Sequence, residues 1–336
     1  MIQQEIKSLQ NRVLKLAHNS EDFDHLALDV FNFQAKYCVV YKAYLQALNV
    51  IPEKITDWKD IPYLPIQFFK THQVKSGEWP AQTYFESSGT TGASASRHNF
   101  LDVALYKELS VLGFQQLVGN NPANYSIYAL LPNYLERGGS SLVFMADHFI
   151  GLNEQGYGGF YLNEFAKLKE DIELKITAGQ KVLLLGVSFA LLNFVEKYKV
   201  NWPEVTIMET GGMKGKRAEL TRAELHDLLK NGFGTEAIAS EYGMTELSSQ
   251  AYAITDGWFK TPAWMKVRVR ETNDPFNYLP AGRTGGLNVI DLANVHSCAF
   301  IETEDLAVCR PDGAFSVLGR YDYAEARGCN LMVSNL

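Results

Sequence analysis

A short run of small and hydroxyl-bearing residues, Tyr-Phe-Glu-Ser-Ser-Gly-Thr-Thr-Gly at positions 84–92, has the composition of a phosphate-binding loop. Its glycines, Gly89 and Gly92, lack a Cβ atom, so backbone N–H groups can close around an anion. Four side chains add hydroxyl donors to the same concavity: Ser87, Ser88, Thr90 and Thr91. The composition predicts a di- or triphosphate ligand, and the alternative is an ordinary surface loop.

Two further motifs follow along the chain. Ser-Glu-Tyr-Gly-Met-Thr-Glu occupies positions 240–246, and Gly-Arg-Tyr-Asp occupies 319–322. Oxygen ligands suit Mg²⁺, which usually takes one or two carboxylates together with substrate phosphates. Glu246 is therefore the candidate magnesium ligand, and the alternative is an exposed acid at a strand-to-helix turn.

In this order, the three motifs resemble the signature motifs of the adenylate-forming, acyl-activating superfamily. That superfamily joins a carboxylate to AMP and then passes the acyl group to a thiol. Leu-Leu-Pro-Asn-Tyr-Leu-Glu-Arg-Gly-Gly-Ser-Ser-Leu at 130–142 and Arg-Gly-Cys-Asn at 327–330 narrow the match. Both segments resemble the acyl-protein synthetase family of bacterial bioluminescence and its acyltransferase relatives. The resemblance extends from about residue 60 to the last residue of the sequence.

The resemblance implies roles for the residues of the second motif. Thr245 would contact the α-phosphate of ATP, and Glu246 would bind the magnesium ion. Tyr242 would stack near the adenine, while Gly243 would permit close approach of the backbone. Gly211 and Gly212 end an expected strand where the superfamily lines its adenine pocket, although a simple turn is the alternative there.

The resemblance also implies which residues would bind the ribose of ATP. Asp305, in Ile-Glu-Thr-Glu-Asp-Leu, stands where an aspartate of the family binds the ribose hydroxyls, and a carboxylate suits that task. The usual Thr-Gly-Asp is Thr-Glu-Asp here, which leaves Glu304 as an alternative to Asp305. Arg320 resembles the arginine that contacts ribose or phosphate.

Arg97 is the candidate cation for the phosphates. Many superfamily members place a lysine just after the phosphate loop, but this chain continues Ala-Ser-Ala-Ser-Arg-His. The Gly-Lys-Ser/Thr ending of a kinase-type phosphate loop is missing, which disfavours a plain NTPase. The alternative for Arg97 is a surface arginine.

Cys329 is the candidate acyl acceptor. A thiolate can attack an acyl-adenylate and hold the acyl group as a thioester. In the family that the chain resembles, a cysteine near the C-terminus receives a fatty acyl group before a reductase partner takes it. Arg327 could favour the thiolate form. The alternative is an ordinary buried cysteine, which is how we interpret Cys38, Cys298 and Cys309.

Composition bounds the class of protein. The chain has 336 residues, of which 46% are hydrophobic and 21% charged, as in a globular protein with a substantial core. The net charge of −7 argues against a non-specific nucleic-acid partner. No apolar run approaches the ~20 residues that cross a bilayer, and the N-terminus lacks the pattern of a signal peptide. Four cysteines without a Cys-x-x-Cys pair favour reduced thiols in a cytoplasmic protein.

Hydrophobic periodicity predicts how these motifs are positioned. We expect two amphipathic helices before residue 50, with Ser20 capping the second, and then an extended connector. Alternating strands and helices follow, which predicts an α/β fold with a mostly parallel, covered sheet. The expected strands are 125–131, 141–145, 181–187, 205–209 and 236–240, and the expected helices are 102–118, 188–199 and 217–230. After residue 257, short strands at 266–270, 286–290, 298–301, 307–310 and 314–318 predict a small β subdomain.

These patterns give three expected units: a helical cap at 1–50, an adenylate-forming core at 51–256 and a β-rich subdomain at 257–336. The fold class expected is therefore the large N-terminal-type domain of an adenylate-forming enzyme. Most members of that superfamily continue with a small mobile C-terminal domain that carries a catalytic lysine. We expect that domain to be lacking here, as in acyl-protein synthetases.

The function that the resemblance implies is a cytoplasmic ligase that depends on ATP and Mg²⁺. It would activate a carboxylic acid, most simply a fatty acid, as acyl-AMP and transfer the acyl group to Cys329 or to the thiol of a reductase, acyltransferase or carrier-protein partner. One alternative is an acyl-CoA ligase or an acyltransferase that serves polysaccharide or lipid assembly. The other is a non-catalytic module that only binds an adenylate.

Overall fold

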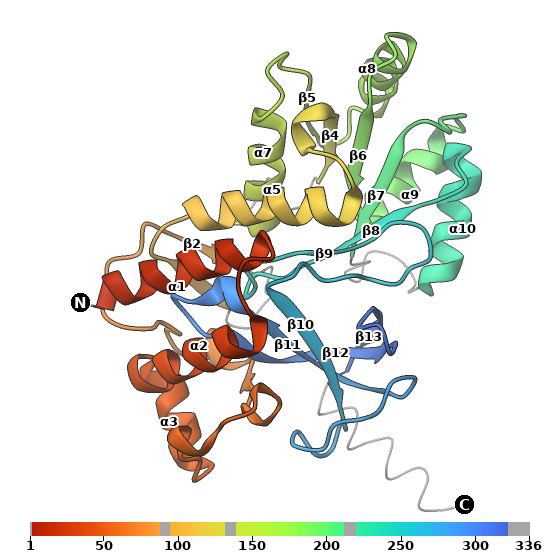
Figure 1. Cartoon of the computed structure of the whole chain (residues 1–336). Helices are drawn as coiled ribbons and strands as arrows, with labels where there is room; N and C mark the ends of the chain where they lie inside the picture. Colours follow the sequence, from red (N-terminus) through yellow and green to blue (C-terminus); the bar gives the residue numbers. More distant parts are fainter. Residues whose placement is uncertain (1, 88–94, 132–138, 212–219, 322–336) are drawn as a thin grey trace, which may run out of the picture.

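Two β-sheets form the framework of the molecule (Figure 1). The computed structural model describes residues 2–87, 95–131, 139–211 and 220–321. The first sheet has six strands in the order β5-β4-β6-β7-β8-β9, and all neighbours are parallel except β8 and β9. Its strands are β4 (Ser126–Leu130), β5 (Gly158–Tyr161), β6 (Val182–Gly186), β7 (Thr206–Thr210), β8 (Ala239–Tyr242) and β9 (Ala251–Ala253). Strands β4, β6 and β8 are buried at every position, as expected for a sheet covered on both faces.

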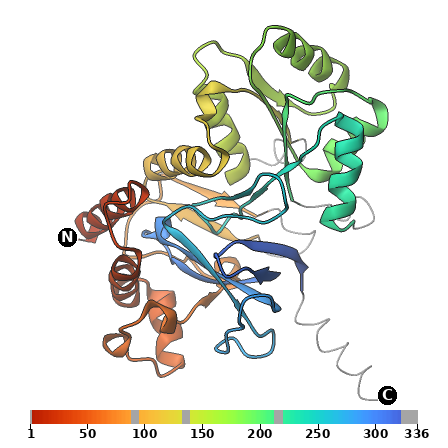
Figure 2. The same ribbon diagram turned by 45° about the vertical axis from the view of Figure 1, so that its right-hand side comes forward.

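Helices cover this sheet from both sides. Figures 1 and 2 show α5 and α7 on one side of the sheet and α9 and α10 on the other. Helix α10 begins with a complete capping box, in which the Thr221 hydroxyl accepts from the Glu224 N–H and the Glu224 carboxylate accepts from the Thr221 N–H. The helices of this part are α5 (Ala104–Val118), α7 (Ser141–Gly151), α8 (Phe165–Thr177), α9 (Ser188–Lys197) and α10 (Arg222–Phe233), with the short η3 (Pro122–Asn124).

The second sheet is mainly antiparallel. Strand β12 pairs with β11 on one edge, and on its other edge it pairs with β1 in its first half and with β13 in its second half. Its strands are β1 (Leu64–Pro65), β10 (Met265–Arg270), β11 (Thr284–Asp291), β12 (Phe300–Cys309) and β13 (Phe315–Arg320), with η4 (Leu292–Asn294) after β11. A separate hairpin joins β2 (Thr83–Glu86) to β3 (Arg97–Phe100), and it flanks residues 88–94.

The first fifty residues form three helices where two were expected: α1 (Ile2–Ala17), α2 (Phe23–Tyr37) and α3 (Val39–Ala47). The expected second helix is interrupted at Cys38, whose backbone is extended and bridges to Ser76. Asp22, not Ser20, caps α2, because its carboxylate accepts from the His25 N–H. The connector holds η1 (Pro52–Lys54), η2 (Trp58–Asp60) and the one-turn helix α4 (Phe68–Thr71).

Two hydrophobic cores correspond to the two sheets. One core joins the N-terminal helices to the second sheet, and the other lies around the six-stranded sheet. Figure 2 shows the two parts one above the other, with α5 between them. The expected α/β fold with mostly parallel strands and an additional β-rich part is confirmed.

Some expected elements differ from the structure. Residues 141–145 were expected as a strand but begin helix α7, because the Ser140 hydroxyl caps the Val143 N–H. The two strands expected at 298–301 and 307–310 form a single strand, β12. Strand β5 and helix α8 were not expected at all.

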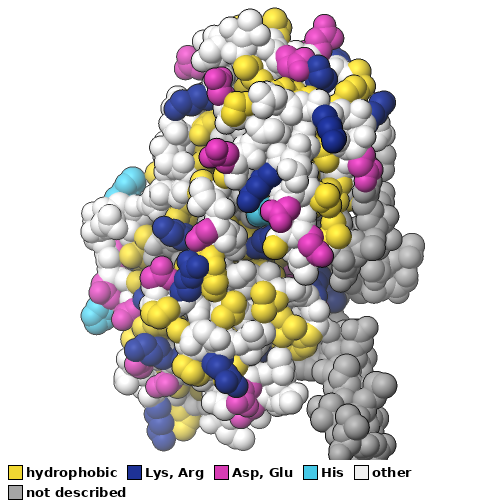
Figure 3. All heavy atoms as spheres, turned by 90° about the vertical axis from the view of Figure 1, so that its right-hand side faces the viewer, with side chains coloured by type: hydrophobic (Ala, Val, Ile, Leu, Met, Phe, Trp, Pro, Cys, Tyr) yellow, Lys and Arg dark blue, Asp and Glu magenta, His cyan; other side chains and the backbone are white. Residues whose placement is uncertain are grey.

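The surface is mixed in character. On the face shown in Figure 3, the described Lys and Arg side chains alternate with Asp and Glu and with apolar patches, so this face has no continuous field of one sign. Among the described residues, none of the helices has the length and apolar character required to span a bilayer.

Candidate active site

Tyr242, the last residue of β8 and the tyrosine of the 240–246 motif, belongs to a polar cluster between the two sheets. The Tyr242 hydroxyl donates to Asp305 Oδ2 at 2.7 Å, and Arg320 Nε lies 3.3 Å from Asp305 Oδ1. Asp305 lies on β12 and Arg320 on β13, where the two residues are direct register partners. The structure therefore brings together three predicted site residues that are as much as 78 positions apart in the sequence (242 to 320).

Asp305 and Glu304 face different partners. Asp305 is 6% exposed and points to Tyr242, whereas Glu304 accepts a hydrogen bond from the Gln67 amide at 2.8 Å. Burial raises the pKa of Asp305, and the Arg320 charge and the Tyr242 hydroxyl oppose that rise. Of the two acids, Asp305 is the one that faces Tyr242 and Arg320.

Glu246 lies in the turn after β8 and is 5% exposed. Burial raises the pKa of its carboxyl group, while a hydrogen bond from Ser96 and the positive charges of Arg320 and Lys70 oppose the rise. Among the described residues no group of three His, Cys, Asp or Glu side chains could enclose a metal ion. A single carboxylate such as Glu246 nevertheless fits Mg²⁺ when substrate phosphates and water supply the other ligands.

Hydrogen bonds hold the backbone of the 240–246 motif from both sides, and they come from residues that the sequence patterns did not single out. On one side, His98 of β3 makes a 3.0 Å contact through Nδ1 with the Thr245 carbonyl oxygen. On the other side, the Asn294 amide of η4 donates to the Glu246 carbonyl oxygen at 2.8 Å. The Asp291 carboxylate accepts from the Ser248 N–H at 2.8 Å. These contacts fix the path of the chain that carries Thr245 and Glu246.

The two histidines near these hydrogen bonds, His98 and His296, are buried and neutral. His98 stacks on His296 with the ring centroids 5.3 Å apart, and burial lowers the pKa of both imidazoles, that of His296 to about 4. A neutral His98 carries one N–H, which can be directed at the Thr245 carbonyl oxygen or at Ser297 Oγ, 2.9 Å from Nε2. The contact of His98 with the 240–246 motif was not predictable from sequence, since the patterns around both histidines resemble those of ordinary core segments.

The glycines of the site serve different needs. A Cβ atom at Gly243 would lie 2.5 Å from Glu241 Oε1, so any other residue there would have to displace the Glu241 carboxyl group. A Cβ atom at Gly211 would meet nothing within 4 Å, and that residue is exposed after β7. Gly212 lies outside the described residues. Packing within the protein therefore explains Gly243 but not Gly211.

The two ends of the expected phosphate loop are joined by hydrogen bonds. The Ser87 N–H donates to the Ser96 carbonyl at 3.0 Å, and the Ser96 N–H donates to Ser87 Oγ at 2.9 Å. The remaining expected loop residues, Ser88, Gly89, Thr90, Thr91 and Gly92, lie outside the described residues. Ser96 also hydrogen-bonds to Glu246, which connects the base of the loop to the second motif.

Arg97 is already paired within the protein. Its guanidinium contacts the Glu86 carboxylate at 2.7 Å and lies over the Tyr84 ring, 4.0 Å from the centroid. Both partners belong to the β2–β3 hairpin, and the Arg97 and Glu86 side chains are 47% and 39% exposed. A phosphate would therefore have to share this guanidinium with Glu86.

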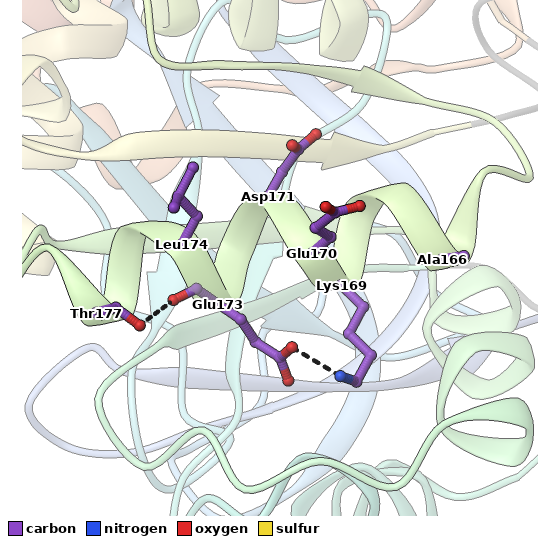
Figure 4. A pocket seen from close by; sticks show the side chains of 7 residues that line it. All are labelled: Ala166, Lys169, Glu170, Asp171, Glu173, Leu174 and Thr177. Atoms are coloured by element: carbon purple, nitrogen blue, oxygen red, sulfur yellow. Dashed lines mark hydrogen bonds and ion pairs between the residues drawn. The ribbon is translucent and has the colours of Figure 1, made fainter.

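A hollow of about 370 Å³ lies beside Arg97, and helix α4 forms part of its wall. Its lining is Phe69, Lys70, Thr71, His72, Gln73, Glu86, Ala95 and Arg97. A second hollow, of about 360 Å³, lies along α8 (Figure 4). There Lys169 pairs with Glu173 at 2.7 Å, and none of the predicted site residues lines the wall. The hollow beside Arg97 is thus the one connected with the motifs.

The described cysteines are poor candidates for a nucleophile. Cys38 and Cys298 are buried, and Cys309 is partly buried. Burial raises the pKa of all three thiols, to about 11 for Cys38 and Cys309. Cys329 and Arg327, the residues expected to serve acyl transfer, lie outside the described residues.

Comparisons with known proteins agree with this arrangement. No protein-family model matches the chain. A stretch of 68 residues, 20% of this chain, is 40% identical to a long-chain-fatty-acid–luciferin-component ligase from Photorhabdus luminescens and covers 58% of that protein.

Similar solved structures are acid ligases at low sequence identity. An open conformation of 2-hydroxyisobutyryl-CoA ligase, in complex with 2-HIB-AMP and CoA, has a TM-score of 0.65 at 12% identity, covering 89% of this chain and 70% of its own. ATP-bound MatB from Rhodopseudomonas palustris has a TM-score of 0.53 at 17% identity, covering 74% of this chain and 49% of its own. O-succinylbenzoate coenzyme A synthetase from Bacillus subtilis, in complex with AMP, has a TM-score of 0.51 at 16% identity, with coverage of 72% and 50%.

The chain spans about half the length of the last two ligases and 58% of the curated relative. The matches to solved structures establish the fold, and the match in sequence is confined to 68 residues. The chain therefore has the fold of the N-terminal domain of the adenylate-forming ligases, which is the fold expected from its motifs.

Proposed function

We propose that this protein activates a carboxylic acid with ATP, forming an acyl-adenylate and pyrophosphate, and then transfers the acyl group to a thiol. The observation that carries the proposal is the convergence of Tyr242, Asp305 and Arg320 beside the buried Glu246. These residues come from three separate segments of the chain, and they meet between two sheets of a fold shared with acid ligases.

In this proposal the cluster binds the nucleoside part of ATP. A carboxylate has about four lone-pair sites, so Asp305 can accept from both ribose hydroxyls while it keeps its contacts to Tyr242 and Arg320. Arg320 is 67% exposed and is free to swing toward the ribose or the α-phosphate. Tyr242 would border the adenine, with Gly211 and Gly212 at the end of β7 on the neighbouring strand.

The phosphates would lie between the 87–92 loop and the 240–246 motif. Backbone N–H groups of the loop, the Thr245 hydroxyl and Arg97 would bind them, and Glu246 would hold Mg²⁺. The metal would neutralise charge on the phosphate chain as pyrophosphate leaves. Burial raises the pKa of Glu246, and a bound cation would lower it and so favour the ionised carboxylate.

A fatty acid is the proposed substrate, and Cys329 is the proposed acceptor. The support for both is the partial match to a ligase whose name specifies a long-chain fatty acid. Transfer would break the bond between the acyl carbon and the AMP oxygen and form a thioester to sulfur. AMP leaves with the electron pair, and the thiol proton passes to solvent.

An acyl-CoA ligase is a second candidate, favoured by a specific observation. The similar structure of 2-hydroxyisobutyryl-CoA ligase contains both 2-HIB-AMP and CoA. In that case the acceptor thiol would belong to CoA, and Cys329 would have no part in the reaction.

Intact-protein mass spectrometry tests the proposal. Wild type, Cys329→Ala and Cys309→Ala are incubated with ATP, Mg²⁺ and a mixture of fatty acids of different chain length. We expect a hydroxylamine-labile acyl adduct on wild type and on Cys309→Ala, and none on Cys329→Ala. Cys309→Ala is the matched control, because burial raises the pKa of its thiol to about 11.

Other outcomes separate the alternatives. Pyrophosphate release without any adduct, together with an acyl thioester when CoA is added, would identify an acyl-CoA ligase. Nucleotide binding without pyrophosphate release for any carboxylic acid would identify a binding module. In that last case Glu246→Gln would change affinity alone.

A further inference from the structure

The hollow beside Arg97 contains a basic side chain that none of the motifs includes. Lys70 lies on the one-turn helix α4, with Phe69 and Thr71 on either side in the same wall. The same hollow is lined by Arg97 at the start of β3, by Ala95 two residues before it and by Glu86 at the end of β2. These are the two strands that flank residues 88–94, so Lys70 faces the base of the expected phosphate loop from a separate part of the chain.

Helix α4 is joined by hydrogen bonds to β12, the strand that contributes Asp305 to the cluster with Tyr242 and Arg320. Gln67, which precedes the helix, donates to the Glu304 carboxylate at 2.8 Å, and the Ile66 N–H donates to the Glu302 carbonyl at 2.9 Å. Both acceptors belong to β12, the strand that carries Asp305. The Phe69 ring packs edge-on against His98, with centroids 5.7 Å apart, and His98 in turn contacts the Thr245 carbonyl. Helix α4 is therefore joined to β12 and, through His98, to the segment that carries Thr245.

Charge also connects Lys70 with the motifs. The positive charges of Lys70 and Arg320 both act on the buried carboxyl group of Glu246. Arg320 lies on β13 and Lys70 on α4, so positive side chains from two different elements stabilise the ionised form of Glu246. Among the described residues, the ionisable groups that line the hollow are Lys70, His72, Glu86 and Arg97. Glu86 pairs with Arg97 at 2.7 Å, which leaves the Arg97 charge partly compensated within the hairpin.

Building on the proposed function, we propose that Lys70 is a phosphate-binding cation of this site. From the hollow, its ammonium group would contact the β- and γ-phosphates and stabilise the charge that develops on pyrophosphate. In that step an oxygen of the substrate carboxylate bonds to the α-phosphorus, the bond from the α-phosphorus to the bridging oxygen breaks, and pyrophosphate leaves with the electron pair. Lys70 keeps its proton throughout and acts by charge alone.

Binding of inorganic tripolyphosphate tests this assignment without ATP or a carboxylic acid. Titration calorimetry would compare wild type with Lys70→Gln, Lys70→Arg and Lys42→Gln. Loss of a charge-assisted contact predicts a dissociation constant at least about 10-fold higher for Lys70→Gln. Lys70→Arg should bind nearly as wild type does, because it keeps the charge. Lys42 is an exposed lysine of α3 outside the hollow, so Lys42→Gln should leave binding unchanged.

Salt dependence provides a readout that a merely structural lysine would not change. Affinity for tripolyphosphate should fall less steeply with ionic strength in Lys70→Gln than in wild type, since one charge has been removed from the site. The thermal midpoint of Lys70→Gln should match that of wild type, because the side chain is exposed. Wild-type affinity and salt dependence in Lys70→Gln would overturn the assignment, as would wild-type protein that does not bind tripolyphosphate.

The proposed function and this assignment fail in distinguishable ways. Lys70-dependent binding of tripolyphosphate in a protein that never releases pyrophosphate would support the assignment and contradict the proposed function. Pyrophosphate release by Lys70→Gln with the wild-type kcat/KM for ATP would support the function and contradict the assignment. If both hold, Lys70→Gln should lower kcat/KM for ATP at least about 10-fold, with KM for the carboxylic acid unchanged.

Discussion

The residue before the motif tyrosine, Glu241, is a buried acid that accepts a hydrogen bond from Thr210. Thr210 Oγ1 of β7 donates to Glu241 Oε2 at 2.5 Å across the parallel pair of strands, and the other carboxylate oxygen faces Gly243. Burial raises the pKa of Glu241 to about 7, and the nearby Glu209 charge adds to the rise. The close contact that a side chain at position 243 would make is thus a consequence of where this carboxyl group lies.

Glu241 should make stability fall as pH rises. Its pKa is raised from 4.5 in the unfolded chain to about 7 in the folded protein, so the folded state binds more protons between these values. Its contribution is fully present below about pH 4.5 and is lost as pH increases through 7. A shift of this size corresponds to about 3 kcal/mol. Urea unfolding of wild type and Glu241→Gln at pH 5 and pH 8 measures the difference.

Glutamine matches glutamate in shape and is neutral, so Glu241→Gln should lose less stability than wild type between these two pH values. Glu304→Gln is the control, because Glu304 accepts its hydrogen bond from Gln67 at the surface. An equal loss of stability in wild type and Glu241→Gln would show that Glu241 is not the titrating group.

At the scale of elements, η4 holds the segment that follows the 240–246 motif. Asp291, its N-cap, accepts from the Ser248 N–H, from the Ser249 hydroxyl at 2.6 Å and from the Ala293 N–H at 3.1 Å. All of these groups are buried, and the Trp264 indole donates to the same Ser249 hydroxyl at 2.8 Å. One carboxylate therefore satisfies the backbone of its own helix and of the segment next to Glu246.

Asp291→Ala should destabilise the protein strongly. It leaves the buried Ser248 and Ser249 donors without this acceptor, in addition to the loss of the helix cap, and the expected cost is about 3 kcal/mol in the free energy of unfolding. Asp57→Ala is a matched control, because Asp57 caps η2 through the Lys59 N–H but is exposed. That variant should lose only about 1 kcal/mol. Urea denaturation of both proteins decides the matter, and equal losses would contradict the role given to Asp291.

Hydrophobic periodicity identified most central strands and their helices, because continuous apolar runs such as Val182–Gly186 are characteristic of a covered parallel sheet. It did not distinguish the apolar run 141–145 from a strand, since only the Ser140 cap shows that a helix begins there. Strand β5 has four residues and begins with two glycines, so it carries little signal. Helix α8 does carry one, because Phe165, Leu168, Ile172 and Ile176 follow the helical period, and the expectation from sequence overlooked it.

Strand β12 shows why the site itself was harder to predict than the sheet. Its middle reads Glu-Thr-Glu-Asp, a polar sequence that resembles a loop and led to two expected strands in place of one. Glu302 is buried because it pairs with Arg270 at 3.0 Å, and Asp305 is buried against Tyr242. Tertiary partners from distant strands compensate these charges, and a single sequence contains no record of such pairs. The motif residues could be predicted from the sequence as parts of the site, whereas Lys70, His98 and Asp291 could not.

At the scale of the whole molecule, the candidate nucleotide site lies at the junction of two structural parts. Tyr242 belongs to the six-stranded sheet, while Asp305 and Arg320 belong to the second sheet, and each sheet has its own hydrophobic core. The three units expected at 1–50, 51–256 and 257–336 stay a prediction. The N-terminal helices share a core with the second sheet, so the division that matters for binding is the one between the two sheets.

A nucleotide bound at this junction should stabilise both parts together. AMP at 100 times its dissociation constant should raise the free energy of unfolding by about 2.7 kcal/mol. Hydrogen exchange should slow at the 242–248 segment and at β12 and β13 in the same titration, because Tyr242 and Asp305 belong to different sheets and are joined by one hydrogen bond. Asp305→Ala should abolish both effects, whereas Glu304→Ala, which lacks only the contact to Gln67, should retain them. Protection confined to one sheet, or an equal loss in the two variants, would place the nucleotide elsewhere and would remove the argument that the two sheets form a single site.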